Sequence, residues 1–153
     1  MTDTAVRSTD QSEVAVFLGT TNRILVRAEQ TGGSISAVEI TVSPGAGSPL
    51  HTNTREALTW YVVMGKLTFQ RDDGPVEVGA GELIFLPKGD THAFMNQAEA
   101  PATALLVCTP GGFEGFLAEL GSMLPSHVPA GPPPQEALEV IAKVGERYGC
   151  AIT

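Results

Sequence analysis

Two histidines are the residues of this sequence best suited to chemistry. His51 lies in the segment SPLHTNTREALTWYVVMGKL, residues 48–67, and His92 lies in GELIFLPKGDTHAFMN, residues 81–96. Imidazole changes its charge near neutral pH, so a histidine in a dry pocket can act as an acid or a base, and its neutral form also binds metal ions. The pattern therefore indicates acid–base chemistry on a bound molecule, or a metal site with ligands missing.

The residues around His92 predict two strands joined by a turn. Gly81 suits a tight hairpin turn, and Pro87 suits the end of a strand, where no ladder donor is needed. Gly89 suits a turn conformation that other residues resist. His92 would then begin the next strand, from which its side chain can point inward.

The wider sequence predicts a single domain of many short strands. It has 153 residues, of which 42% are hydrophobic, and it contains 17 Gly and 11 Pro. Apolar runs alternate with turn sequences such as TGG, SPGAGSP and RDDGP, which favours a sandwich or barrel. The expected strands cover residues 14–19, 23–29, 34–42, 57–65, 66–70, 75–78, 82–87, 92–96 and 102–110.

The pattern changes after residue 110. Phe113, Phe116, Leu117 and Leu120 are spaced as one face of an amphipathic helix. After a Pro-rich connector, residues 134–149 predict a second helix. Its expected buried stripe is Leu138, Ile141 and Val144, or Ala142 in place of the last, and Gly149 is the expected C-terminal cap. We therefore expect a flexible tail at 1–12, a barrel at 13–110 and a helical extension packed on it at 111–153.

Composition argues against several kinds of partner. The formal charge of −8 disfavours nucleic acid and anionic membrane surfaces, which require clustered Lys and Arg. No apolar stretch is long enough to span a membrane, and the first residues do not resemble a signal peptide. Cys108 and Cys150 lie far apart without a CxxC motif, so we expect reduced thiols and a cytoplasmic protein. Cys108, in an apolar run, is expected to be an inert buried thiol.

The segment 81–96 resembles the second conserved motif of the cupin superfamily at every fixed position. The segment 45–65 resembles the first motif, with Gly45, His51 and Gly65 in place. Asn53 stands where that motif has its second His, and Leu58 stands where it has Glu. Further blocks, including YVVMGKLTF and TPGGFEGF, look like those of small single-domain cupins related to quercetin dioxygenases.

This resemblance implies an all-β jelly-roll barrel with one or two C-terminal helices. It also implies a metal held by two His and one Glu of the first motif and the His of the second. His51 and His92 are the two ligands that this chain retains. Because the only anionic ligand is gone, we expect no cofactor beyond a weakly bound divalent metal such as Fe, Mn, Ni or Zn.

Strand alternation predicts what surrounds the two histidines. Side chains two positions apart share a face, so Asn53 joins His51, and Phe94 joins His92. The neighbouring strand adds Leu58, Trp60 and Val62 on one face. The predicted substrate site is therefore a mainly apolar pocket with a few polar groups. Glu56 and Arg55 are expected in the turn, at the surface.

Three functions fit these expectations. The first is an enzyme that acts on a hydrophobic, aromatic or polyketide-like molecule by proton transfer from or to His51 and His92, as a cyclase or isomerase does. The second is a metal-dependent, dioxygenase-like oxidoreductase that uses the same histidines. The third is a cupin that binds a small molecule without chemistry. Each predicts a small hydrophobic partner, and we further expect a homodimer, through the N-terminal strands or the C-terminal helix.

Overall fold

The computed structural model describes residues 4, 6, 8–129 and 131–153. Of the predicted tail, residues 1–3, 5 and 7 lie outside the described residues. The rest contains a short 3-10 turn, Thr9–Gln11, before the first strand. No helix among the described residues is long and apolar enough to cross a membrane.

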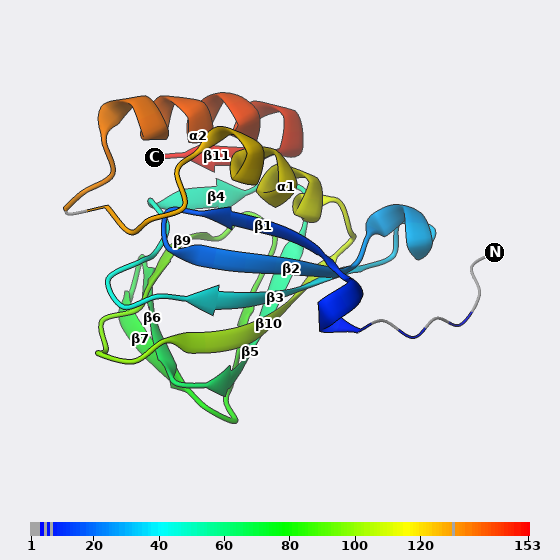
Figure 1. The fold of residues 1–153 in the computed structure, drawn as a ribbon, viewed down its shortest axis with the longest axis horizontal. Helices are drawn as coiled ribbons and strands as arrows, with labels where there is room; N and C mark the ends of the chain where they lie inside the picture. Colours follow the sequence, from blue (N-terminus) through cyan, green and yellow to red (C-terminus); the bar gives the residue numbers. More distant parts are fainter. Residues whose placement is uncertain (1–3, 5, 7, 130) are drawn as a thin grey trace.

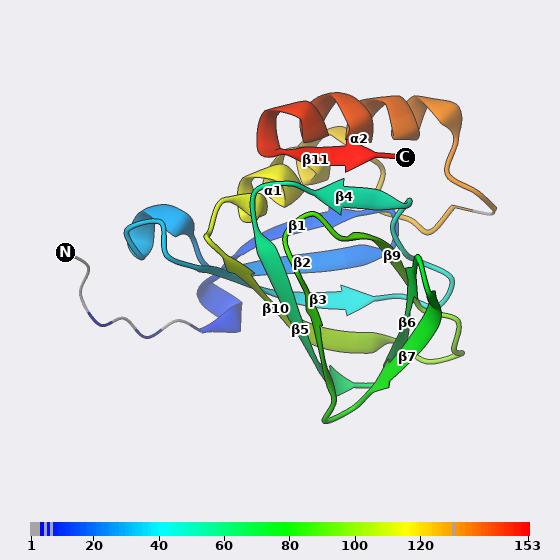
Figure 2. The same ribbon diagram turned by 180° about the vertical axis from the view of Figure 1, so that it is seen from behind.

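Two antiparallel sheets face each other in a jelly roll (Figures 1 and 2). The six-stranded sheet has the order β1-β2-β3-β10-β5-β8, and the five-stranded sheet has the order β11-β4-β9-β6-β7. The strands are β1 Glu13–Phe17, β2 Thr20–Val26, β3 Ser36–Val42, β4 His51–Asn53, β5 Ala57–Met64, β6 Lys66–Arg71, β7 Gly74–Gly79, β8 Leu83–Leu86, β9 Thr91–Met95, β10 Ala102–Thr109 and β11 Cys150–Ile152. The all-β class and the nine strands expected from turn spacing are confirmed.

The core lies between the sheets because the strands alternate in burial. β3 buries every second residue along its whole length, and β10 does so up to its last position, as expected for strands with one face inside. Phe69, Leu67, Val62 and Leu106 are fully buried between the two layers. Such close packing fixes the register of each strand, since a slip by one residue would turn its apolar face outward.

A glycine allows the chain to pass from one sheet to the other after β5. Gly65 has φ +77°, and a Cβ there would lie 2.7 Å from the carbonyl oxygen of Pro101. Both the backbone conformation and the close approach therefore require glycine. This turn ends β5, which carries Leu58 and Trp60, and starts β6.

The two helices lie at one end of the barrel, and the predicted face of the first is confirmed. α1, Phe113–Met123, buries all four of its predicted apolar positions. α2, Gln135–Tyr148, buries Ile141 and Val144 as predicted, but Ala137 takes the third place and Leu138 is only half-buried. Residues 137, 141 and 144 lie on one helical stripe, and the smaller side chain at 137 is the one that faces the barrel.

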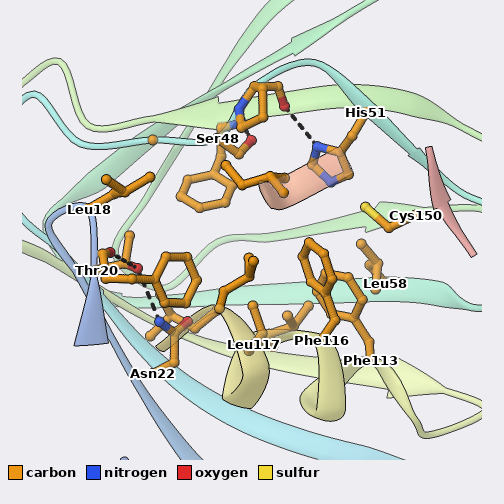
Figure 3. A pocket seen from close by; sticks show the side chains of 18 of the residues that line it. Leu18, Thr20, Asn22, Ser48, His51, Leu58, Phe113, Phe116, Leu117 and Cys150 are labelled. Carbon is orange, nitrogen blue, oxygen red and sulfur yellow. Dashed lines mark hydrogen bonds between the residues drawn. The ribbon is translucent and has the colours of Figure 1, made fainter. Parts of the chain in front are cut away.

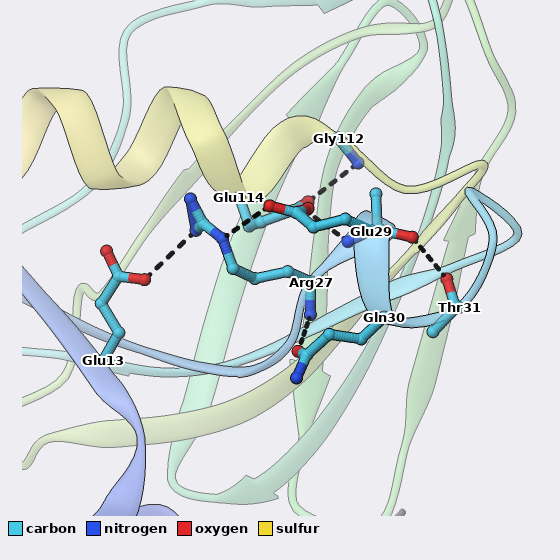
Figure 4. A network of polar contacts seen from close by, with 8 residues as sticks. Glu13, Arg27, Glu29, Gln30, Thr31, Gly112 and Glu114 are labelled. Carbon is cyan, nitrogen blue, oxygen red and sulfur yellow. Dashed lines mark hydrogen bonds and ion pairs between the residues drawn. The ribbon is translucent and has the colours of Figure 1, made fainter. Parts of the chain in front are cut away.

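A buried carboxylate holds the start of α1 against the loop after β2 (Figure 4). Glu114 accepts hydrogen bonds from the backbone N–H of Ala28 at 2.7 Å and of Gly112 at 2.8 Å. Burial alone would raise the pKa of Glu114, but these donors outweigh it and the pKa is lowered. Nearby, Arg27 pairs with Glu13 and Glu29.

The sequence predicts a purely helical C-terminal segment, but the structure adds a strand after the second helix. Gly149 caps α2 with φ +70°, as predicted, and the chain then returns as β11, which pairs with β4. Gly145 permits this return, since a Cβ there would lie 2.2 Å from the carbonyl oxygen of Cys150. Three residues carry too little alternation to predict a strand, which forms here because β4 offers it a free edge. β11 therefore covers the edge of the strand that begins at His51.

Candidate functional site: a histidine pair at an apolar cavity

The two histidines lie side by side because β4 and β9 pair in a register that sets them opposite each other. His51 is the direct partner of His92 in the antiparallel ladder. Their ring centroids are 4.5 Å apart with an interplanar angle of 58°. The side chains are buried, with 6% of His51 and 1% of His92 exposed. The structure therefore brings the histidines of the two motif segments together.

Backbone carbonyls determine which nitrogen of each ring carries the proton. Nδ1 of His51 lies 2.8 Å from the carbonyl oxygen of Pro49, and Nδ1 of His92 lies 3.4 Å from that of Asp90. A carbonyl can only accept, so Nδ1 is the protonated nitrogen of each neutral ring. Nε2 is then left as a lone-pair acceptor, and Nε2 of His92 has no partner among the described residues.

Both rings are neutral at pH 7. Burial lowers the pKa of His51, although the Pro49 carbonyl and the Asn53 side chain act in the opposite direction. Burial, together with the neighbouring His51, lowers the pKa of His92 to about 4. His51 has the shorter bond to its carbonyl and the additional help of Asn53. His51 is therefore the ring that accepts a proton more readily. Once one ring is charged, its charge opposes protonation of the other.

A carboxyl group that the sequence analysis placed at the surface lies next to Asn53. Glu56 does lie in the turn before β5, but only 3% of it is exposed, so the surface expectation is wrong. Nδ2 of Asn53 donates to Oε2 of Glu56 at 3.3 Å, and burial raises the pKa of Glu56. Residues of a turn lose strand alternation, so no period in the sequence marked the inward direction of Glu56.

The histidine pair borders a cavity of about 70 Å³ between the sheets and under α1 (Figure 3). Leu58, Trp60 and Phe94 of the predicted set lie on its wall with both histidines. Asn53 and Val62 are buried but are not among the residues that line it. The rest of the wall is mostly apolar. It consists of Phe17, Leu18, Thr20, Asn22, Ile40, Gly47, Ser48, Pro49, Leu106, Phe113, Phe116, Leu117, Leu120, Ile141, Cys150 and Ile152.

Trp60 combines core packing with an unused donor. Its ring packs against Phe94 at 5.0 Å and Phe69 at 5.4 Å between centroids. Its indole Nε1 is buried and has no acceptor among the described residues. A buried indole N–H normally finds a partner. Trp60 thus lines the same cavity as the two imidazoles and has an indole donor without a partner among the described residues.

Sequence reasoning missed the wall that α1, β1, β2 and β11 contribute. The apolar residues of α1 had been recognised as a buried face, but only the docking of the helix shows that they close the cavity. Thr20 and Asn22 are polar residues at buried positions of β2, which begins earlier than the predicted strand. Thr20, Asn22 and Ile24 are spaced two residues apart, and this alternation could have indicated that all three point to the same side of the strand.

The donor set does not fit the divalent metal that the cupin resemblance implies. No group of three or more His, Cys, Asp or Glu that could hold a metal occurs in the described part of the chain. Leu58, in the place of the carboxylate, is buried on the cavity wall. The Cys150 thiol is no substitute, because burial and the nearby Glu56 raise its pKa to about 12. Two neutral imidazoles leave the charge of a divalent ion uncompensated.

Comparison with known proteins agrees with the fold. The cupin domain family matches residues 38–108, which include both motif segments and both histidines. Over these residues the chain is similar to the cupin domain family, and its two facing antiparallel sheets form the jelly roll described above. No curated protein shows significant sequence similarity to the chain.

Several solved structures superpose on this one. A sugar phosphate isomerase from Silicibacter pomeroyi is 23% identical, with 69% of this chain and 75% of that chain covered and a TM-score of 0.60. The polyketide cyclase RemF from Streptomyces resistomycificus is 24% identical, with coverage of 70% and 80% and a TM-score of 0.61. A predicted oxalate decarboxylase from Thermotoga maritima is 18% identical, with coverage of 69% and 99% and a TM-score of 0.65. These similarities describe the fold, which hosts several chemistries.

Proposed function

We propose that this cupin binds a small hydrophobic molecule in its barrel and moves a proton on it with His51 as the base. The observation that carries the proposal is the pair of neutral, buried imidazoles, whose Nε2 atoms are left as acceptors beside an apolar cavity. A general base must be unprotonated at working pH and within reach of the bound molecule. The mainly apolar wall supports a hydrophobic ligand.

The two histidines have different roles in this proposal. His51 takes the proton at Nε2, while its Nδ1–H remains bonded to the Pro49 carbonyl and stabilises the imidazolium. The Asn53 side chain also favours the charged ring. His92 stays neutral, because its pKa near 4 and the charge on His51 both oppose protonation. The pair therefore takes up only one further proton, in addition to the Nδ1–H of each ring.

The electrons released by proton removal require a donor. For a ligand with a carbonyl group, the C–H bond next to the carbonyl breaks, its proton goes to His51, and the electron pair moves onto the carbonyl oxygen as an enolate. The buried indole N–H of Trp60 is the donor available at this cavity for that oxygen. Return of the proton at another position completes an isomerisation. Attack by the enolate carbon on a second carbonyl forms an alkoxide, and this oxygen takes the proton back from His51 to complete a cyclisation.

A simple exchange reaction tests this step without knowledge of the natural substrate. In D₂O, 2-indanone, an apolar ketone with exchangeable C–H groups, should lose its proton signals faster with the protein than with buffer, as followed by ¹H NMR. His51→Gln, which keeps the size and a hydrogen-bonding group, should abolish the enhancement. Trp60→Phe should reduce it by about 10-fold or more, the typical effect of removing one donor to a developing oxyanion. Binding of 2-indanone without enhanced exchange would reject the base and favour a binding protein without chemistry.

We also propose that the protein forms a homodimer through β1, an edge strand of the larger sheet. Val14 and Val16 project from this edge with 42% and 37% of each side chain exposed. Unpaired edges that carry apolar side chains favour pairing with another strand. Light scattering after size exclusion should give twice the monomer mass for the wild type and the monomer mass for Val16→Lys.

A further inference from the structure

A second polar group lies at the far end of the cavity from His51. Thr20 and Asn22 of β2 project into it between Leu18 and Leu117, while His51 and Cys150 lie at the other end (Figure 3). Only 1% of Asn22 is exposed, and Thr20 is also buried. A buried carboxamide in an apolar wall is costly unless each of its polar atoms finds a partner.

The orientation of the Asn22 amide is fixed by its neighbours. Nδ2 of Asn22 lies 3.1 Å from the carbonyl oxygen of Ala15 and 3.0 Å from Oγ1 of Thr20. The Thr20 hydroxyl donates its own hydrogen to the carbonyl oxygen of Phe17 at 2.9 Å, so its oxygen can only accept from Asn22. Both neighbours of Nδ2 are thus acceptors. The NH₂ group must face them, and the reversed amide would set oxygen against oxygen.

The carboxamide oxygen is left for something in the cavity. Both hydrogens of Nδ2 are used by Ala15 and Thr20, and no described residue donates to Oδ1. The Asn22 side chain points into the cavity (Figure 3). The chain of bonds from Phe17 through Thr20 to Asn22 therefore presents a rigid acceptor, oriented before any ligand arrives.

We infer that Asn22 is a specificity residue that binds a hydroxyl or N–H donor on a hydrophobic ligand, with phenols as the ligand class. The aromatic body would lie among the apolar side chains of α1 and the barrel, with its hydroxyl donating to Oδ1 of Asn22. The opposite end of the ligand would face His51. This inference shares with the proposed function only the assumption that the ligand occupies this cavity.

Phenol and toluene provide the test, because they have nearly the same shape and differ in one donor. Dissociation constants for both are measured by ligand-observed NMR on the wild type and on Asn22→Leu. Loss of one hydrogen bond should weaken phenol binding by about 3- to 10-fold. Toluene binding should stay the same or improve. An equal change for both ligands would overturn the assignment.

A variant of the supporting hydroxyl and a matched control refine the result. Thr20→Val removes one of the two acceptors that orient Nδ2, so the amide is held less firmly and the phenol preference should decrease. Thr103→Val makes the same change in the same sheet, where the Thr103 hydroxyl bonds only to Thr41 at 3.2 Å, away from the cavity wall. It should keep the wild-type preference. A preference that Thr20→Val leaves at the wild-type level would contradict the fixed-amide argument.

A measurement on the unmutated protein covers the case in which Asn22→Leu does not fold. The side-chain ¹H–¹⁵N signals of Asn22 should shift further on addition of phenol than on addition of toluene, because only phenol donates a hydrogen bond to the amide oxygen. Identical responses to both ligands would overturn the inference. The same titration on His51→Gln separates the two proposals, because the phenol preference should persist there even though proton exchange is lost.

Discussion

The buried His92 should make the protein lose stability as the solution becomes acidic. Its imidazole is neutral in the folded protein, because burial and the nearby His51 lower its pKa to about 4. In the unfolded chain the same ring titrates near 6.5. Between these two values the unfolded state binds the proton more tightly. Stability is therefore fully present above pH 6.5 and falls as the pH decreases toward 4.

The size of the effect follows from the distance between the two pKa values. A proton that binds to the unfolded chain at 6.5 and to the folded chain only near 4 lowers the free energy of unfolding by about 3 kcal/mol over this range. His51, whose pKa is also lowered, adds to the loss. The raised pKa of Glu56 acts in the opposite direction, because the folded protein binds this proton more tightly than the unfolded chain and is stabilised as Glu56 becomes protonated.

A comparison of variants isolates the contribution of His92. Urea unfolding is followed at several pH values by the fluorescence of Trp60, the single tryptophan, which is buried in the core. His92→Leu should lose about 3 kcal/mol less than the wild type between pH 7.5 and 4. His127→Asn, at an exposed position of the connector, should retain the wild-type dependence. A His92→Leu variant that loses stability with acid as steeply as the wild type would refute the reasoning.

Three further changes test separate parts of the account. Glu56→Gln removes the cost of ionising a buried carboxyl. The difference in unfolding free energy, variant minus wild type, should therefore increase from pH 4 to pH 8. A difference that stays constant would contradict a raised pKa of Glu56. Leu58→Glu should lower Tm by burying an unpaired charge, and Zn²⁺ should restore Tm in this variant but not in the wild type. A wild-type Tm raised equally by Zn²⁺ would contradict the donor-set argument. Gly65→Ala should cost about 1–2 kcal/mol more than Gly81→Ala, because both positions have positive φ but only the first has backbone within 3 Å of the added Cβ. Equal losses in urea unfolding would show that the close approach does not matter.

The fold was largely predictable because its information is local. Turn sequences and apolar runs located nine strands, and the resemblance of the segment around His92 to the second cupin motif implied the jelly roll. The strand after Gly149, β11, was not predicted, because its three residues show no clear alternation and its pairing depends on the free edge of β4. One position of the buried stripe of α2 was wrong, with Ala137 in place of Leu138, because both lie close to the stripe and only the packed surface decides between them.

The site was predictable where strands define it and not elsewhere. Alternation placed Leu58, Trp60 and Phe94 correctly beside the histidines. Glu56 was misplaced, because a turn has no period from which to infer burial. The Thr20–Asn22 end and the α1 wall required the tertiary packing of segments far apart in the sequence.

The central claim is that both imidazoles are neutral with Nδ1 protonated, and that His51 is the first to take a proton. Long-range ¹H–¹⁵N NMR of the histidine rings reports tautomer and charge for each residue. The account predicts neutral Nδ1–H rings for His51 and His92 at pH 7. On acidification His51 should be protonated first, with His92 unchanged until the pH approaches 4. A charged ring at pH 7, an Nε2–H tautomer of His51, or protonation of His92 before His51 would contradict it.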